Sequence, residues 1–205
     1  PVYWSNNLGA IFARMFLYML LAAGAAQLAL IEVQYVTWRP PFHELGFVEI
    51  AQSMLLAASM VLLFWLARTR PQQARLALCA ALAVAILLIR ENDQTLEFFL
   101  PHGAWKWVAL PVAAALVWQC IRHRHALNTQ MQSFAGAPPF GVYLAGGSTL
   151  LFSRLFGNKV FWEAVMSERY FRPVKNAAQE GIELFALGLF FAATVEWVVW
   201  ARRAR

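Results

Sequence analysis

The sequence predicts an all-α fold: a polytopic integral membrane bundle of six transmembrane helices, with one interfacial amphipathic helix in the fifth connection. Of the 205 residues, 60% are hydrophobic and only 14% are charged, whereas soluble domains carry about 25% charged residues. The apolar residues also gather in stretches close to the length of about 20 residues that a helix needs to cross a bilayer. This composition excludes a disordered chain and argues against a soluble domain.

Six apolar stretches are long enough to span the membrane. They lie at residues 9–38, 45–67, 75–99, 104–121, 139–157 and 176–201. Because these stretches account for most of the chain, we expect one transmembrane domain over residues 1–205, with no separate soluble domain.

The ends of the stretches carry residues that stop helices or favour the membrane interface. The first stretch contains an uncharged run over residues 15–31, and the third has an apolar centre over residues 76–89. Prolines fall between the stretches, where helices are expected to stop: Pro40, Pro41, Pro71, Pro101 and Pro138. Pro111 lies inside the fourth stretch and predicts a kink there. Tryptophans cluster near the predicted ends, as interfacial anchors do: Trp38, Trp65, Trp105, Trp107, Trp118, Trp197 and Trp200.

The distribution of charge predicts an orientation. The connections on one side carry arginines and no acidic residue: Arg14, Arg68, Arg70, Arg75, Arg122, Arg124, Arg202, Arg203 and Arg205. By the positive-inside rule this side is cytoplasmic. We therefore expect an inner-membrane protein with both termini in the cytoplasm. All acidic residues except Glu196 fall toward the outer side.

Several of the outer charges lie within the spans. Glu49 shares a helical face with Gln52 and Ser53, three and four residues later. Arg90 and Glu91 end the apolar run of the third span. If that helix continues to Phe99, a single stripe contains Arg90, Asp93, Gln94 and Glu97.

The fifth and sixth spans add a second polar group. Arg154 lies near the outer end of the fifth span, beside Ser153. At the start of the sixth span one face contains Asn176, Gln179, Glu180 and Glu183. Charge within lipid is costly, so these groups should face inward and pair. We therefore predict a buried network in which Glu49, Glu180 and Glu183 meet Arg90, Arg154 and Lys175.

The connection after the fifth span, residues 158–172, alternates apolar and charged side chains and predicts the interfacial amphipathic helix. This helix could cap the bundle, gate the lateral entry of a lipid, or dock a partner.

Two interpretations of the outer charges stay open. Paired charges can simply fix the register of helices, whereas ionisable residues inside a membrane also mark functional sites. In the functional interpretation, a lipid or lipid-linked headgroup is bound or modified at the outer leaflet. The candidate catalytic residues are then Glu49, Glu180 and Glu183, and the candidate substrate-binding residues are Arg90, Glu91, Asp93, Arg154, Arg172 and Lys175.

The alternative is a non-catalytic subunit or assembly factor of a larger membrane complex, and a small transporter comes third. Against the transporter, the cytoplasmic halves of the spans carry no continuous polar path. The sequence leaves open whether the protein is an enzyme, because it carries no nucleophile or phosphate-loop motif.

The expected partners are membrane lipids and other membrane subunits, with no nucleic acid, because a membrane accounts for the formal net charge of +6. We expect no cofactor. No histidine lies in the middle of a span, and His123 and His125 fall in a basic loop. A carboxylate-only metal site at Glu49, Glu180 and Glu183 would compete with the nearby arginines, so no metal is expected either.

Overall fold

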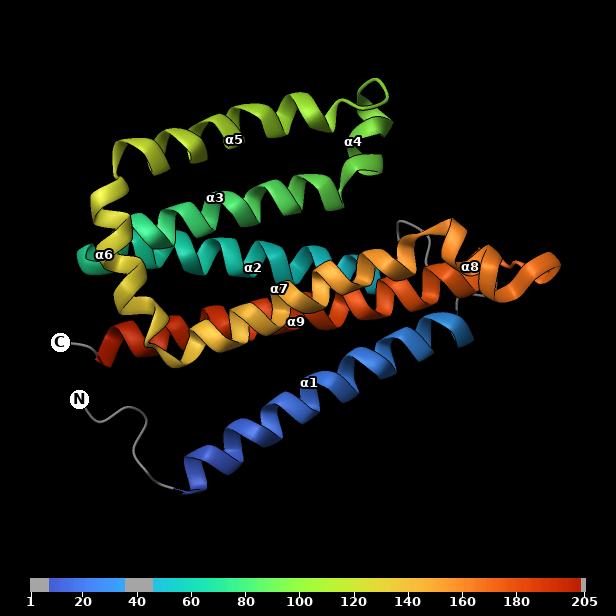
Figure 1. The fold of residues 1–205 in the computed structure, drawn as a ribbon, viewed down its shortest axis with the longest axis horizontal. Helices are drawn as coiled ribbons and strands as arrows, with labels where there is room; N and C mark the ends of the chain where they lie inside the picture. The colour runs from blue at the N-terminus through green and yellow to red at the C-terminus, as the bar shows by residue number, and fades with distance from the viewer. Residues whose placement is uncertain (1–7, 36–45, 204–205) are drawn as a thin grey trace. The chain divides into compact units, whose positions relative to one another are not determined.

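The computed structural model describes residues 8–35 and 46–203, and the structure in this part of the chain is helical throughout, without strands (Figure 1). The long helices are α1 (Leu8–Tyr35), α2 (Phe47–Thr69), α3 (Ala74–Glu91), α5 (Trp105–Arg122), α7 (Pro138–Gly157) and α9 (Arg172–Arg203). The shorter elements are η1 (Pro71–Gln73), α4 (Asp93–Phe99), α6 (Arg124–Ala135), α8 (Lys159–Met166) and η2 (Ser167–Arg169). The all-α prediction is confirmed.

Four segments of the described residues are long and apolar enough to cross a membrane: Ile11–Gln34, Phe47–Thr69, Pro71–Glu91 and Arg172–Arg202. They indicate a membrane-embedded, multi-pass protein. The fourth and fifth predicted spans also fold as helices, α5 and α7, but neither belongs to this group. Their apolar character is diluted by Lys106 and Arg122 in α5, and by glycines, hydroxyl residues and Arg154 in α7. Six spans therefore stay a prediction.

The chain forms two compact units. Unit 1 consists of residues 1–51 and 144–189, so its described part contains α1, the start of α2, most of α7, α8, η2 and most of α9. Unit 2 consists of residues 52–143 and 190–205, and contains the rest of α2, η1, α3 to α6, the start of α7 and the end of α9.

A buried carboxylate connects α1 to α2 in unit 1. Glu32 is fully buried, and its Oε2 accepts a hydrogen bond of 2.8 Å from the backbone N–H of Val48, in the first turn of α2. The first N–H groups of a helix have no partner within the helix, and the helix dipole favours an anion there. Gly46 admits the carboxylate, because a Cβ at this position would collide with the Glu32 side chain. Residues 36–45, between the two helices, lie outside the described residues.

Part of the predicted interfacial segment 158–172 is helical. Asn158 caps α8 by accepting a hydrogen bond of 2.9 Å from the N–H of Val160. The helix ends at Met166 because Ser167 adopts a positive φ of 51°, and η2 follows. The helix is thus shorter than predicted, and its place at a membrane interface stays a prediction.

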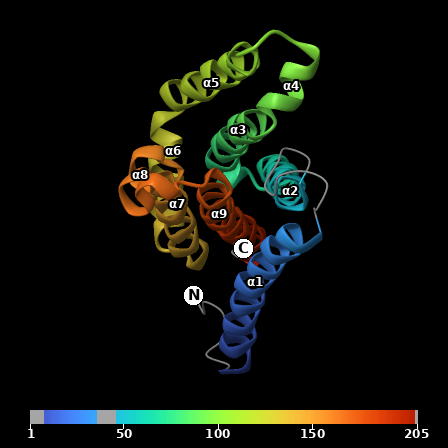
Figure 2. The ribbon, with the colours of Figure 1, turned by 90° about the vertical axis from the view of Figure 1, so that its right-hand side faces the viewer.

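In unit 2, α3 and α5 lie side by side (Figure 2). The prediction that the third helix could continue to Phe99 is wrong, because α3 ends at Glu91. The Asn92 side chain donates a hydrogen bond of 2.9 Å to the carbonyl of Leu88, and its amide lies 3.0 Å from Ser53 Oγ on α2. Asparagine competes in this way with backbone hydrogen bonds and so interrupts the helix. The predicted stripe from Arg90 to Glu97 is therefore divided between α3 and α4.

The basic loop predicted around His123 and His125 is also wrong, since residues 124–135 form helix α6. In Figure 1, α6 runs across the ends of α3 and α5 instead of along them. The Gln130 side chain accepts a hydrogen bond of 2.8 Å from the N–H of Leu76, in the first turn of α3. Phe134 is buried, with its ring centroid 4.3 Å from that of Trp197 on α9.

The turn between α4 and α5 is closed by Glu97. Its Oε1 accepts a hydrogen bond of 2.7 Å from the N–H of Gly103, and its Oε2 lies 2.7 Å from Nδ1 of His102. Gly103 has a φ of +81°, a conformation that favours glycine. The hydrogen bond from Gly103, and then that from His102, hold the pKa of the Glu97 carboxyl below its ordinary value.

This turn should be sensitive to acid. A lowered pKa means that the ionised carboxylate favours the closed turn at neutral pH, and this contribution is lost as the pH falls through the lowered pKa. In an NMR titration of the protein in detergent, the Gly103 amide resonance should move upfield with a midpoint below the ordinary glutamate range. The variant Glu97→Gln should remove the transition. A midpoint in the ordinary range would contradict the hydrogen bonding described.

Gly46→Ala should destabilise the protein. The added methyl would displace the buried Glu32 carboxylate from the Val48 N–H, so we expect the free energy of unfolding to fall by about 1–3 kcal/mol. The control is Gly24→Ala in α1, where a Cβ meets nothing within 4 Å and should stabilise the helix by about 0.5–1 kcal/mol. Thermal unfolding in detergent compares the two, and equal effects would argue against the carboxylate contact.

Candidate polar site on helices α7 and α9

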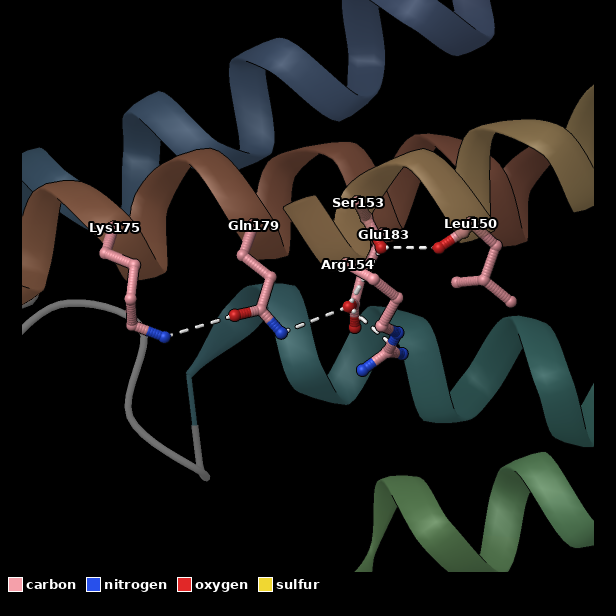
Figure 3. Close-up of polar contacts among 6 residues, drawn as sticks. All are labelled: Leu150, Ser153, Arg154, Lys175, Gln179 and Glu183. Carbon is pink, nitrogen blue, oxygen red and sulfur yellow. Dashed lines mark hydrogen bonds and ion pairs between the residues drawn. The ribbon is translucent and has the colours of Figure 1, made fainter. Parts of the chain in front are cut away.

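Three polar side chains form a ladder along the first half of α9. Lys175, Gln179 and Glu183 follow each other at intervals of four residues, so they share one helical face. Lys175 Nζ lies 3.2 Å from Gln179 Oε1, and Gln179 Nε2 donates a hydrogen bond of 3.1 Å to Glu183 Oε1 (Figure 3). The ladder spans two helical turns and ends at a carboxylate that is only 3% exposed.

Helix α7 supplies two more partners for the same carboxylate. Arg154 Nη2 lies 3.2 Å from Glu183 Oε1, and Ser153 Oγ lies 3.1 Å from it (Figure 3). The Ser153 hydroxyl also lies 2.7 Å from the carbonyl of Leu150, and its single proton serves one acceptor at a time. Donors from two helices thus converge on one oxygen, and this satisfies a charge that would otherwise be costly to bury.

Gly157 allows α7 to approach this ladder closely. A Cβ at this position would lie 2.8 Å from Gln179 Oε1. Arg154 lies one turn before Gly157 on α7, and Glu183 lies one turn after Gln179 on α9. These two residues form the ion pair described above. The missing side chain at Gly157 is therefore part of the fit between the two helices.

Aromatic residues close the end of α7 beside the site. Trp162 on α8 donates its indole N–H to the carbonyl of Phe156, over 2.6 Å. The Phe156 ring also packs edge to face against Phe152 and Phe161. The hydrogen bond satisfies one of the last carbonyls of α7, which have no partner within the helix.

Arg154 is paired with Glu183 but remains partly exposed, and its neighbours along α7 include exposed apolar residues. The Arg154 side chain is 41% exposed. Leu151 and Leu155, on the same helix and adjoining its position, are 76% and 43% exposed. A guanidinium has five N–H donors, so a second anion can bind to the side that faces away from Glu183.

The predicted pairing of Glu183 with Arg154 is confirmed, and Lys175 joins them through Gln179. Glu180, which is half-buried on α9, has a carboxylate oxygen within 4.8 Å of one of Glu183. Of the other predicted site residues in unit 1, Glu49 lies in the first turn of α2, and Arg172 is exposed at the start of α9. In unit 2, the residues at the junction of α3 and α4 are Arg90, Glu91 and Asp93. The roles assigned to all of these residues stay predictions.

The sequence analysis missed Glu32, which is the most deeply buried carboxylate among the described residues. It was counted only as one of the outer acids. The available signal was a carboxylate near the end of an otherwise apolar span, a position where an ionisable residue needs a partner. The partner is a backbone N–H, which no side-chain pattern can reveal.

Comparison of the chain with protein families, with curated proteins and with solved structures found no match in any of the three. The fold and the site define a class, an all-helical protein with four helices long and apolar enough to cross a membrane and a charged cluster between α7 and α9. Any more specific function has to be argued from the geometry of the cluster.

A double-mutant cycle tests the coupling of Arg154 to Glu183. Arg154→Met leaves a buried carboxylate without its cation and should lower the free energy of unfolding by about 1–3 kcal/mol, a range discounted for the partial exposure of Arg154. Adding Glu183→Gln should restore part of that loss, because glutamine still accepts from Ser153 and Gln179.

The exposed pair of Lys159 and Glu163, 3.0 Å apart on α8, gives the control. Lys159→Met should leave the free energy of unfolding nearly unchanged, because both side chains of this pair are exposed to solvent. Additive effects of the two substitutions at Arg154 and Glu183 would refute the coupling.

Proposed function

We propose that this chain is a six-span inner-membrane protein that binds a phosphate-bearing lipid or lipid-linked headgroup at the outer leaflet, through the cluster on α7 and α9. In this proposal α1, α2, α3, α5, α7 and α9 are the spans, and both termini are cytoplasmic. The arginine-rich connections on one side support the orientation through the positive-inside rule.

The observation that carries the proposal is the position of Arg154. Its side chain is partly exposed beside the apolar residues Leu151 and Leu155, which suit the acyl chains of lipids. A cation in such surroundings is costly unless an anion neutralises it. Glu183 already engages one terminal nitrogen, and the planar fork of the guanidinium matches the oxygens of a phosphate.

Two further cations support an anionic ligand. Lys175 has three N–H donors, and the hydrogen bond to Gln179 uses one of them. Arg172 lies three residues earlier on α9 and is exposed. Residues three apart share a helical face, so both cations are placed to attract the same headgroup.

The hydrogen bonding of Glu183 favours binding over catalysis by this residue. Arg154, Ser153 and Gln179 all converge on Oε1 of Glu183. A buried carboxylate paired with an arginine fixes the position of the guanidinium. Its role in this proposal is to hold Arg154 in place, and the chemistry of modification, if the protein is an enzyme, would fall to Glu49 or Glu180.

The alternative, a subunit of a larger membrane complex, is favoured by α1. Large apolar residues along this helix are exposed, among them Phe12, Phe16, Met19 and Leu20. Such a surface can face lipid or pack against the helix of another subunit.

Native mass spectrometry of the protein, extracted from its own membrane in mild detergent, tests the proposal. The wild-type chain should retain a phospholipid or lipid-linked adduct. Arg154→Lys keeps the charge beside Glu183 but loses the fork, and should reduce the retained fraction several-fold without loss of folded protein. The double variant Arg154→Gln/Glu183→Gln, which leaves no unpaired buried charge, should abolish retention.

Arg169→Gln in η2 is the matched control, because it removes an exposed arginine outside the cluster. Equal retention by wild type and the double variant would overturn the proposal. A heavier assembly that contains other polypeptides, with no lipid adduct, would favour the subunit alternative.

A further inference from the structure

One end of unit 2 carries a cluster of arginines that the proposed function does not use. They lie at the end of α2, the start of α3, the end of α5, the start of α6 and the end of α9: Arg68, Arg75, Arg122, Arg124 and Arg202. Each of these five side chains is exposed. We call them the arginine cluster of unit 2.

Contacts within unit 2 bring these helix ends together. Gln130 on α6 binds the first turn of α3 through the Leu76 N–H. Phe134 on α6 packs against Trp197 on α9. The Arg202 guanidinium lies 4.7 Å from the centroid of the Trp65 ring, which connects the end of α9 to the end of α2.

Acidic residues are scarce around the cluster. The sequence contains no aspartate or glutamate over residues 98–162, which include α5, α6 and α7, and none over residues 50–90. Glu196 on α9 is the acidic residue of unit 2 nearest to Arg202 in sequence, and it is buried. The five arginines outnumber it, so this end of unit 2 carries an excess of positive charge that favours anions from outside the chain.

His123 reports the same electrostatic environment. Partial burial, and then the positive charges of Arg75 and Arg122, hold the pKa of His123 below its ordinary value. The imidazole is therefore mostly neutral at neutral pH, and the charge at this end comes from arginines. Arginine keeps its charge at any physiological pH and binds phosphate through two parallel hydrogen bonds.

The orientation of α6 suggests what supplies the anions. Helix α3 belongs to the membrane-spanning segment Pro71–Glu91, and α6 runs across its end (Figure 1). If α3 crosses the bilayer, α6 lies along the membrane surface. The exposed residues of α6 are mainly polar, among them His125, Asn128, Thr129 and Gln132, whereas Phe134 faces inward. Phe134 thus holds α6 against the protein, and the polar face of α6 is left for contact with water and lipid headgroups.

We infer that α6 and the arginine cluster of unit 2 form a surface that binds the headgroups of anionic phospholipids. A lipid surface fits better than a free anion, since the arginines are spread over several helix ends and Trp65 lies among them, as aromatic residues do at bilayer interfaces. The inference uses residues of unit 2 only and does not rest on the proposed function.

Local lipid enrichment around α6 tests the inference. The full chain carries one dye, attached through Asn128→Cys in a background with Cys79→Ala and Cys120→Ser. It is reconstituted in phosphatidylcholine vesicles that contain brominated phosphatidylglycerol, or the same amount of brominated phosphatidylcholine. Because bromine quenches only within contact range, the dye reports the lipids that adjoin α6 and not those at Arg154.

Quenching should be stronger with brominated phosphatidylglycerol, and the preference should weaken as salt is raised. Arg122→Gln and Arg124→Gln should each lower the apparent affinity for the anionic lipid by about fivefold. Lys106→Gln, at the other end of α5, removes the same charge and should leave the preference unchanged. Equal quenching by the two lipids, or an equal loss in Lys106→Gln, would overturn the inference.

Discussion

Burying a carboxylate in an apolar protein is the constraint on which the rest of this structure depends. Glu183 is almost inaccessible to solvent, and polar groups of Arg154, Ser153 and Gln179 all lie within hydrogen-bond distance of its Oε1, which offsets the cost of burying it. Two of these donors come from α7 and one from α9, so the charge can be satisfied at a single register of the two helices. Gly157 suits this register because a Cβ there would lie 2.8 Å from Gln179 Oε1 and displace the end of that side chain.

The same constraint determines how α1 joins α2. Glu32 is fully buried and is stabilised by a backbone N–H at the start of α2, and Gly46 makes room for it. Along α1 the less exposed residues recur at intervals of three and four, including Tyr18, Leu21, Ala25 and Glu32. Apolar packing alone would allow this helix to slide, whereas a buried charge that needs one N–H fixes its position.

Much of this fold could be predicted from the sequence, because long apolar stretches bounded by proline, tryptophan and arginine can only satisfy their backbone in a membrane as helices. The six predicted spans begin and end within a few residues of α1, α2, α3, α5, α7 and α9, apart from the break at Asn92. The contact of Asn92 with Ser53 accompanies that break, and contacts with Leu76 and Trp197 hold α6 in place. All three contacts join residues that are distant in sequence. In the site, the spacing along α9 predicted the face that carries Glu183, and burial of charge predicted its pairing with Arg154. The contact with Ser153 depends on the register of α7 against α9, which no sequence pattern gives.

The interval of four residues along α9 also determines which parts of the chain tolerate a change of length. Each residue turns an α-helix by about 100°, so inserting or deleting one residue between Lys175 and Glu183 would rotate one end of the ladder away from the other. The connection between α7 and α9 has no such phase relation, because α8 and η2 are short elements and the helical path is broken where η2 begins, at the positive φ of Ser167. Natural variation in length should therefore accumulate around residues 167–171 and be excluded from residues 175–183.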